Sequence, residues 1–317
     1  YGSDKPDIRF EMFLKDLSGV TKDSTFRVFS NAISKGGVVK GVVAPGMGEA
    51  GRKDLEELIS LAQAFGAGGL VTLGLPRSMS SLEDLTKETV RSMVANALDI
   101  AEMKTLLHSA NAAPGDLLLI AAGPEEMVNV VLGHIRLHLA NKLELIDQTQ
   151  IAFCVIHDFP LFEWNEEAQR WNARHHPFTA PQNTDRGLLQ ADPGKVLAKA
   201  YDLACNGMEL AGGSIRNHQR GFQEDMFKLL GFDKVEAQEQ FGQLLDALES
   251  GAPPHGGFAG GIERLVMVLS ETAESIRDTM AFPKTQSASD PLFGAPSPVA
   301  PKQLEELHIK ADIYDVS

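Results

Sequence analysis

The segment YDLACNGMEL, residues 201–210, contains the sequence signal that decides the fold. Asn206 and Gly207 lie between two apolar, strand-like runs, and Asn-Gly favours a two-residue type I′ hairpin turn. Such a turn fixes which residues face each other across the hairpin. The predicted pairs are Cys205 with Met208, Ala204 with Glu209, Leu203 with Leu210 and Asp202 with Ala211.

This register places two carboxylates on one face of the hairpin. Successive side chains along a strand point to opposite faces. One face carries Leu203, Cys205, Met208 and Leu210, and the other carries Asp202, Ala204, Glu209 and Ala211. As diagonal neighbours at about 7 to 8 Å, Asp202 and Glu209 could both reach one magnesium ion, directly or through water. A solvent-facing sheet with two ordinary acids explains the same pattern.

Arg216 ends the run LAGGSIR that continues the second strand. It lies seven residues after Glu209, so strict alternation would put the two side chains on opposite faces. If both serve one pocket, Gly212 and Gly213 must form a bulge or kink that shifts the parity. The guanidinium would then offer a planar fork to a carboxylate or phosphate, whereas the alternative is a salt bridge that closes the sheet.

The segment GAPPHGGFAGGIERLVMVL, residues 251–269, places Gly256, Gly257, Gly260 and Gly261 before a helical run. A ligand can approach such a backbone closely. Arg264 falls in the first predicted helical turn, where the positive end of the helix and the guanidinium both favour a phosphate. The segment matches neither a P-loop nor a dinucleotide fingerprint. Tight packing between strand and helix explains the glycines equally well.

The sequence HHPFTAP, residues 175–181, follows a charged polar stretch that we predict to be a loop. Pro177 directs His176 toward an extended conformation. One of the two histidines could close over a substrate. Ordinary surface or turn chemistry is the alternative for a histidine pair in a loop.

Residues 25–145 alternate strand-like and helical runs, which predicts a compact α+β module. The strand-like runs are TFRVF, VVKGVVAP, GLVTLGL and DLLLIAAG. Apolar residues at helical spacing predict helices at residues 53–65 and after Pro124. His134 and His138 on the second helix have the spacing of a metal pair, but no Glu follows the first and no third ligand is evident. We predict that they lie on a solvated face.

The chain has 317 residues, which suggests two structural units, and its 43% hydrophobic and 23% charged residues are typical of a globular protein. The two cysteines, Cys154 and Cys205, cannot form a disulfide framework or a cysteine-based zinc site, which fits a reducing cytoplasm. The net charge of -14 argues against non-specific nucleic-acid binding, so any RNA contact must be local. No run is long enough to span a membrane, and the start is no signal peptide.

Five segments, in order along nearly the whole chain, closely resemble the bacterial-type aspartyl-tRNA synthetases, a class II family. They are YGSDKPDIRF, HHPFTAP, YDLACNGMELAGGSIRNH, GAPPHGGFAGGIERL and IRDTMAFPKT. The resemblance implies an α+β fold in which helices flank an antiparallel class II sheet. Residues 1–20 would begin a segment of the catalytic domain, residues 21–146 would form an inserted, GAD-like α+β domain shared with an amidotransferase subunit, and residues 147–317 would complete the catalytic domain with motif 3.

The resemblance also implies a function. Members of the family activate L-aspartate with ATP to aspartyl-adenylate and transfer it to the 3′ end of tRNA(Asp). Asp202 and Glu209 would hold the Mg²⁺ on ATP, Arg216 would grip the side-chain carboxylate of L-aspartate, and His175 would close its loop onto the amino acid. The residues implied to bind ATP are Glu209, Gly261, Ile262, Glu263 and Arg264.

The chain departs from the family pattern at two positions. Glu263 stands where the family commonly has Asp, and Gly260 where a larger apolar residue is usual, so the wall of the adenine pocket is expected to be altered. The family's anticodon-binding barrel, its motif 1 with the homodimer contacts, and its motif 2 all lie upstream of YGSDKPD. Because the chain opens at Tyr1, we interpret it as a fragment that alone binds ATP weakly and charges tRNA poorly. ATP–pyrophosphate exchange at the rate of a full-length enzyme would contradict this.

Two alternatives stay open. A non-catalytic module that binds tRNA or a protein partner, built around the inserted domain, would not need Glu209, Arg216 and Arg264 together. A non-discriminating enzyme that also charges tRNA(Asn) is compatible with the sequence, because the anticodon-reading part of the family lies outside it. Only tRNA assays separate the two synthetase specificities.

Overall fold

The computed structural model describes residues 1–183, 187–270 and 272–311. Two compact units, Tyr1–Gly260 and Gly261–Ser317, are each described by themselves. Within the described residues, the first unit holds three antiparallel sheets, with strand orders β1-β2-β4-β3, β10-β9-β8-β5 and β6-β7. Because the helices combine with antiparallel rather than parallel strands, the predicted α+β class is confirmed.

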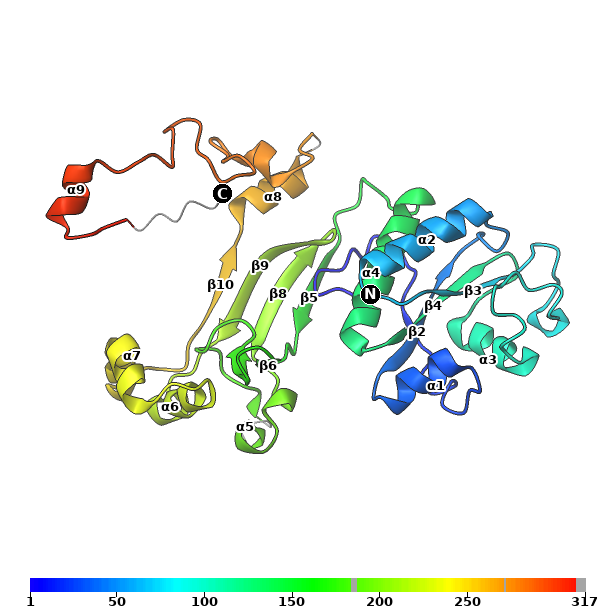
Figure 1. Ribbon diagram of the computed structural model, residues 1–317, viewed down its shortest axis with the longest axis horizontal. Coiled ribbons are helices and arrows are strands. Elements are labelled where there is room, and N and C mark those ends of the chain that lie inside the picture. Colours follow the sequence, from blue (N-terminus) through cyan, green and yellow to red (C-terminus); the bar gives the residue numbers. More distant parts are fainter. Residues whose placement is uncertain (184–186, 271, 312–317) are drawn as a thin grey trace. The chain divides into compact units, whose positions relative to one another are not determined.

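The first sheet lies between two pairs of helices (Figure 1). Its strands are β1 (Lys15–Asp16), β2 (Val38–Ala44), β3 (Val71–Gly74) and β4 (Leu117–Gly123). Its helices are α1 (Arg27–Ser34), α2 (Arg52–Ala64), α3 (Ile100–Ala110) and α4 (Glu125–Lys142), with the short 3-10 helix η1 at Leu82–Asp84. Along β4, Leu118 and Ile120 join the cluster that includes α1 and α3, whereas Leu117 and Leu119 join the cluster of α2 and α4. Because both faces are covered, this strand is an unbroken apolar run.

The structure corrects one strand prediction in this region. The helices predicted at residues 53–65 and after Pro124 are confirmed as α2 and α4. The run TFRVF is not a strand, because α1 begins at Arg27. Phe29 and Ala32, three residues apart, are both buried on one side of this helix. Burial at helical spacing outweighs the local strand preference of an aromatic and β-branched run.

The second sheet contains the hairpin. Its strands are β5 (Phe153–His157), β8 (Ala200–Cys205), β9 (Met208–Ile215) and β10 (Gly256–Gly260). The type I′ turn is confirmed, since Asn206 has φ 51° and Gly207 has φ 82°. The side chain of Asn206 also ties the turn to the chain before β5, because its amide donates to the carbonyl of Gln150 at 3.0 Å and its oxygen accepts from the backbone N–H of Ala152 at 3.0 Å.

The predicted register is confirmed next to the turn and wrong beyond it. Cys205 faces Met208 and Ala204 faces Glu209, but the register then shifts, so that Leu203 faces Ala211 and Asp202 faces Gly212. Leu210 is the extra residue of this bulge, and its side chain is buried. The bulge therefore lies two residues before the predicted Gly212-Gly213 position.

Gly213 has a different role from the one predicted. A Cβ atom at this position would lie 2.7 Å from the ring atom Cε2 of Tyr201 and would collide with the backbone oxygen of Gly257 on β10. The phenolic oxygen of Tyr201 donates to that same carbonyl at 3.0 Å. Gly213 thus permits the close approach of its neighbouring strands.

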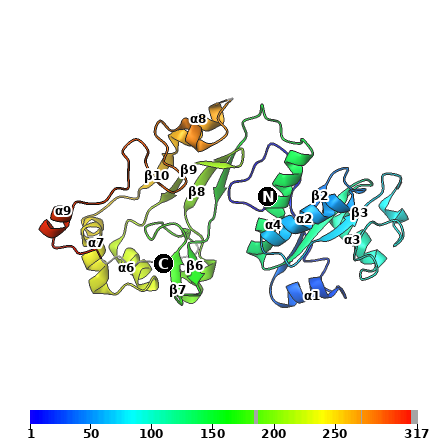
Figure 2. The same ribbon diagram turned by 45° about the horizontal axis from the view of Figure 1, so that its top comes forward.

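The remaining elements of the first unit lie between β5 and β8 and between β9 and β10. The polar stretch before the histidine pair is a hairpin of β6 (Phe162–Asn165) and β7 (Arg170–Ala173), in which the rings of Trp164 and Trp171 pack edge to face. The helices α6 (Arg220–Leu229) and α7 (Lys234–Glu249) pack together, as Figure 2 shows. The short helices α5 and η3 span Leu188–Ala191 and Pro193–Lys195.

The second unit contains helix α8 (Ile262–Leu269), η4 (Ile276–Thr279) and α9 (Pro301–Glu306). Helix α8 confirms the helical run predicted after the glycine-rich segment. Nowhere in the described ranges does a helix have both the length and the apolar character that crossing a bilayer requires.

The tight packing at Gly213 generates a prediction. Gly213→Ala should lower the free energy of unfolding by about 1–3 kcal/mol, because β10 must move away from the new methyl group. Gly257→Ala, on the facing strand, is the matched control, since no atom lies within 4 Å of its Cβ position. Urea unfolding of both variants measures the difference, and equal stabilities would contradict the proposed contact.

Candidate functional site

The two hairpin carboxylates converge on one point of the sheet. Asp202 on β8 faces Gly212 on β9. A Cβ atom at Gly212 would lie 2.6 Å from Oδ1 of Asp202 and 3.4 Å from Oε1 of Glu209. Asp202 and Glu209 therefore share a face, as the alternation predicted, and Gly212 leaves the space between their oxygens open.

The electrostatic surroundings of Asp202 match this geometry. Burial raises the pKa of its carboxyl above the ordinary value, and the negative charges of Glu209 and Asp4 raise it further, while His175 opposes them. Like charges held together in this way are relieved by a cation. Within the described residues, no group of three or more His, Cys, Asp or Glu side chains could hold a metal. A magnesium ion at this pair would thus take further oxygen ligands from phosphate or water.

The bulge at Leu210 changes which residues of β9 share a face with Glu209. One extra residue shifts the alternation, so Gly212 and Ser214 follow Glu209 on one side of the strand, and continued alternation would bring Arg216 to that side as well. Just beyond β9, the backbone N–H of Arg216 donates to the carbonyl of His255 at 2.9 Å. The predicted parity shift is confirmed, although it arises at a different residue.

The two histidines lie at this face in different environments. His175 is exposed, and its ring packs edge to face on Phe159 at 4.9 Å. His176 is half-buried, with Nε2 at 3.4 Å from the hydroxyl oxygen of Ser214. Burial lowers the pKa of His176, and the positive charges of Arg216 and His175 lower it further. The imidazole of His176 therefore favours its neutral form at neutral pH.

Sequence reasoning chose His175 and missed His176 as a residue of this face. The available signal was Pro177, because a proline favours an extended conformation of the residue before it, here His176. The contact of His176 with Ser214 crosses 38 residues of sequence, so no local pattern could report it.

The loop that carries the histidines is fastened to the end of β9. Thr179 bridges to Arg216, and the backbone N–H of Asn217 donates to the carbonyl of Phe178 at 2.8 Å. The fully buried Gln223 on α6 accepts from the side-chain amide of Asn217 at 3.1 Å and donates to the carbonyl of Pro177 at 2.9 Å. The histidine loop is thus held by polar contacts on both sides.

The predicted ATP-binding residues Gly261, Ile262, Glu263 and Arg264 lie in the second unit. Gly261 precedes α8 and its carbonyl accepts from the backbone N–H of Leu265 at 3.0 Å. Arg264 occupies the first turn of the helix, as predicted, and is partly exposed. Gly260, just before them, ends β10 opposite Ala211.

His134 and His138 do not form a metal pair. The ring of His134 stacks on Phe65, with centroids 3.6 Å apart. Nε2 of His138 lies 3.3 Å from Oε1 of Glu57. The two imidazoles have separate partners, one on α2 and one on the residue that follows it. His134 is exposed, as a solvated face predicts, whereas His138 is half-buried.

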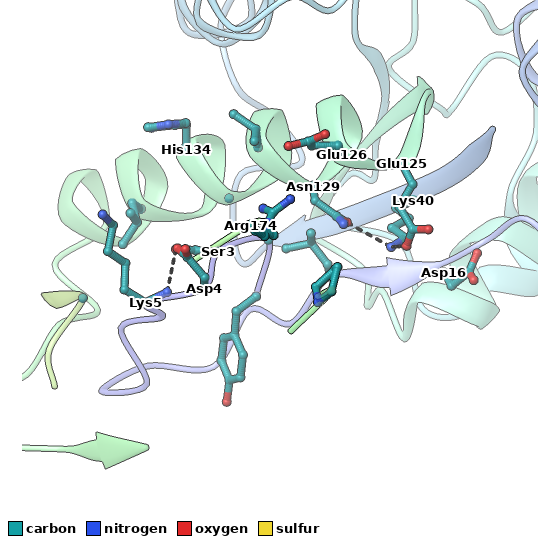
Figure 3. A pocket seen from close by; sticks show the side chains of 18 residues that line it. Ser3, Asp4, Lys5, Asp16, Lys40, Glu125, Glu126, Asn129, His134 and Arg174 are labelled. Carbon is teal, nitrogen blue, oxygen red and sulfur yellow. Dashed lines mark hydrogen bonds and ion pairs between the residues drawn. The ribbon is translucent and has the colours of Figure 1, made fainter. Parts of the chain in front are cut away.

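A cavity of about 990 Å³ lies beside the hairpin turn. Residues from Tyr1 to Lys5, several from α4, and Arg174 and Gly207 line it. Figure 3 shows Lys40 directed at α4, where its ammonium group donates to Glu125 at 2.7 Å and Asn129 at 2.9 Å. No sequence pattern predicts this cavity. Its lining includes both the start of the chain and Arg174, the residue before the histidine pair.

Comparison with known proteins gives consistent matches. The family described as tRNA synthetases class II (D, K and N) matches residues 1–286. A relative from Dehalococcoides mccartyi, named Aspartate–tRNA(Asp/Asn) ligase, is 50% identical over 310 residues, which are 98% of this chain and 52% of the relative. A protein of the same name from Caldanaerobacter subterraneus is 45% identical over 313 residues, or 99% of this chain and 51% of the relative. The chain spans about half the length of these curated relatives.

The buried amide of Gln223 generates a prediction about stability. Gln223→Ala should lower the free energy of unfolding by about 1–3 kcal/mol, because the Asn217 amide and the Pro177 carbonyl lose their partner. Gln243→Ala, an exposed position on α7, is the matched control. Thermal unfolding compares them, and a Gln223→Ala variant as stable as the control would rule out a role for this contact in holding the loop.

Proposed function

Because the chain belongs to the class II tRNA synthetases of the D, K and N type, we propose that it is part of an aspartate–tRNA ligase. The proposed reaction activates L-aspartate with ATP to aspartyl-adenylate and transfers the aspartyl group to the 3′ end of tRNA(Asp), releasing AMP. One observation carries the proposal: Asp202 and Glu209 converge on one face of an antiparallel sheet, and Ser214 on the same face contacts His176 of the histidine pair.

In this proposal, Asp202 and Glu209 hold the Mg²⁺ that accompanies ATP. Their oxygens converge at Gly212, and burial together with the negative charge of Glu209 raises the pKa of Asp202. A bound cation would relieve both effects. Carboxylates together with substrate phosphates are the ligand set that Mg²⁺ commonly takes. When bound, the ion neutralises charge on the triphosphate.

Arg216 is the proposed receptor of the aspartate side chain. Its planar guanidinium can bind a carboxylate through two parallel hydrogen bonds. Asparagine would present an amide N–H₂ to the same donors, so the arginine would disfavour it. The exposed His175 would close over the amino acid, while the neutral His176 offers a hydrogen bond beside Ser214 without adding charge.

The chemistry needs no general base from the protein. The α-carboxylate of aspartate is already ionised at neutral pH and can attack the α-phosphorus of ATP directly. Holding the two reactants in line and neutralising the phosphates then account for the rate. The proposed site residues supply this positioning and this charge neutralisation. Pyrophosphate is the leaving group.

We assign ATP contacts to the start of α8. Gly261, Ile262 and Glu263 would supply backbone beside the nucleotide, and Arg264 would lie against it and reach a phosphate. The position of Arg264 in the first helical turn supports this, because the helix N-terminus also favours negative charge. Glu263 and Gly260, at which the chain departs from the family pattern, would shape the adenine side.

The domain division remains part of the proposal. Residues 21–146 would be the inserted domain, because they supply β2, β3 and β4 and most of two hydrophobic clusters, which β1 and Leu17 complete from just before this range. Residues 1–20 and 147–317 would belong to the catalytic domain. A homodimer is proposed for the whole protein, as in the family that the sequence resembles.

We also propose that the whole protein charges tRNA(Asn) in addition to tRNA(Asp). The supporting observation is the name Aspartate–tRNA(Asp/Asn) ligase, which both relatives described above carry. Aminoacylation of purified tRNA(Asp) and tRNA(Asn) by the intact protein tests this. Aspartylation of tRNA(Asp) alone would contradict this proposal and show that the enzyme discriminates against tRNA(Asn).

The activity itself is tested by ATP–pyrophosphate exchange with the intact protein. We expect exchange that requires both L-aspartate and Mg²⁺. Binding of tRNA without any aspartate-dependent exchange would instead support the alternative of a non-catalytic tRNA-binding module.

The role of Arg216 generates a prediction about kinetics. Arg216→Lys should lower kcat/KM for aspartate about 10- to 100-fold, because a charged, bidentate contact contributes about 1.5–3 kcal/mol. The exchange assay with varied aspartate measures this. Arg52→Lys, an exposed arginine on α2, is the matched control and should leave kcat/KM unchanged. A wild-type kcat/KM in Arg216→Lys would exclude the assigned contact.

A further inference from the structure

Helix α4 contains a buried arginine whose partners are three consecutive backbone carbonyls. Arg136 is 1% exposed. Its Nη2 donates to the carbonyls of Phe10 and Glu11, each at 2.9 Å, and its Nε donates to that of Met12 at 3.0 Å. The guanidinium also lies 3.8 Å from the ring centroid of Phe10 and 4.8 Å from that of Tyr1. One side chain thus holds a stretch of chain that precedes it by more than 120 residues.

The backbone at residues 10–12 explains why an arginine is needed. Met12 has φ 64°, a left-handed conformation that is unusual for a residue other than glycine. Residues 10–12 belong to no helix or strand, so their carbonyls require partners from elsewhere. A guanidinium offers five donors in one plane and can satisfy several carbonyls at once. Burying its charge is costly, and only a well-satisfied site compensates that cost.

A second contact fixes the same segment to α4. A Cβ atom at Gly133 would lie 2.6 Å from the backbone oxygen of Gly2, and Gly2 itself has φ 76°. Gly133 and Arg136 are three residues apart and so lie on the same side of the helix. The start of the segment and its residues 10–12 are therefore both held by one face of α4.

Between these two contacts, the segment passes the hairpin turn. Asp7 is buried and forms an ion pair with Arg9 at 2.7 Å. The Cβ atom of Asp7 lies 3.6 Å from the Cβ position of Gly207, in the turn that joins β8 to β9. Arg9 also donates to the side chain of Gln148 at 3.3 Å. A shift of the segment would therefore displace the turn of the hairpin that carries Asp202 and Glu209.

The segment also faces the histidine side of the site. Asp4 lines the same cavity as Gly207 and Arg174, and Arg174 immediately precedes His175 (Figure 3). The part of the segment held by α4 thus borders the side of the site that is proposed to bind the amino acid.

We propose that Arg136 is a positioning residue of the adenylation site: by holding residues 10–12 and, with Gly133, the start of the chain on α4, it sets where the segment lies against the β8–β9 hairpin and the histidine loop. The inference rests on the function proposed above for that site. It assigns helix α4 a role in amino-acid binding in addition to its role in its own hydrophobic core.

The test uses the intact protein and ATP–pyrophosphate exchange. Arg136→Met keeps the length and apolar stem of the side chain but removes all three hydrogen bonds. We expect KM for aspartate to rise about 10- to 100-fold, the size of effect that a misplacement of about 1 Å can have. Arg136→Lys retains the charge without the planar fork and should give an intermediate value.

Two further variants separate positioning from stability. Leu132→Ala, in the core of the same helix, should lower the Tm with no change in KM for aspartate. Gly133→Ala leaves Arg136 intact but pushes against Gly2, so it should reproduce the rise in KM even if Arg136→Met fails to fold. An unchanged KM for aspartate in Gly133→Ala and Arg136→Lys, or an equal rise in Leu132→Ala, would overturn the proposal.

Hydrogen exchange gives a readout that does not depend on catalysis. Amides of residues 1–12 should exchange faster in Arg136→Lys than in the wild type, while those of β4 stay protected. Equal protection of residues 1–12 in both proteins would overturn the proposed clamp. A wild-type protein without aspartate-dependent exchange would instead count against the proposed function, so the two failures are distinguishable.

Discussion

The repulsion between Asp202 and Glu209 is the constraint on which the rest of the proposed site depends. A tight turn forces both carboxylates onto one small patch of sheet, and Gly212 leaves no side chain between them. Burial and the negative charge of Glu209 both raise the pKa of Asp202. A sheet that keeps such a pair gains stability when a cation binds, because the ligand favours the folded form.

The sequence was informative where structure is determined locally. The Asn-Gly pair fixes its own turn and the two residue pairs beside it, so Ala204 and Glu209 could be matched without coordinates. The bulge at Leu210 could not be located in the same way, because the burial of that side chain depends on packing from distant segments. The run TFRVF failed for a related reason: Phe29 is buried in a cluster that includes β2, β4 and α3, and this tertiary packing determines α1.

For the candidate site, motifs and the alternation of side chains along a strand predicted the residues on the hairpin. They did not predict the residues whose contacts fix the neighbouring segments. Asp202, Glu209 and Arg216 come from one continuous stretch, whose alternation can be followed residue by residue. Gln223 and Arg136 act through backbone carbonyls of segments far away in the chain. Such contacts leave no spacing or composition signal, since a carbonyl is present at every residue.

The bulge at Leu210 limits how this part of the chain can change in length. Deleting one residue between Glu209 and Arg216 would remove the bulge, and inserting one would add a second bulge. Either change would reverse the alternation and turn the guanidinium of Arg216 to the far side of the sheet, even if every strand still formed. Lengthening the loop between β6 and β7 by one residue would carry no such penalty, because that loop sets no alternation in the sheet. We therefore expect natural length variation in the loop between β6 and β7 and a fixed length between Glu209 and Arg216.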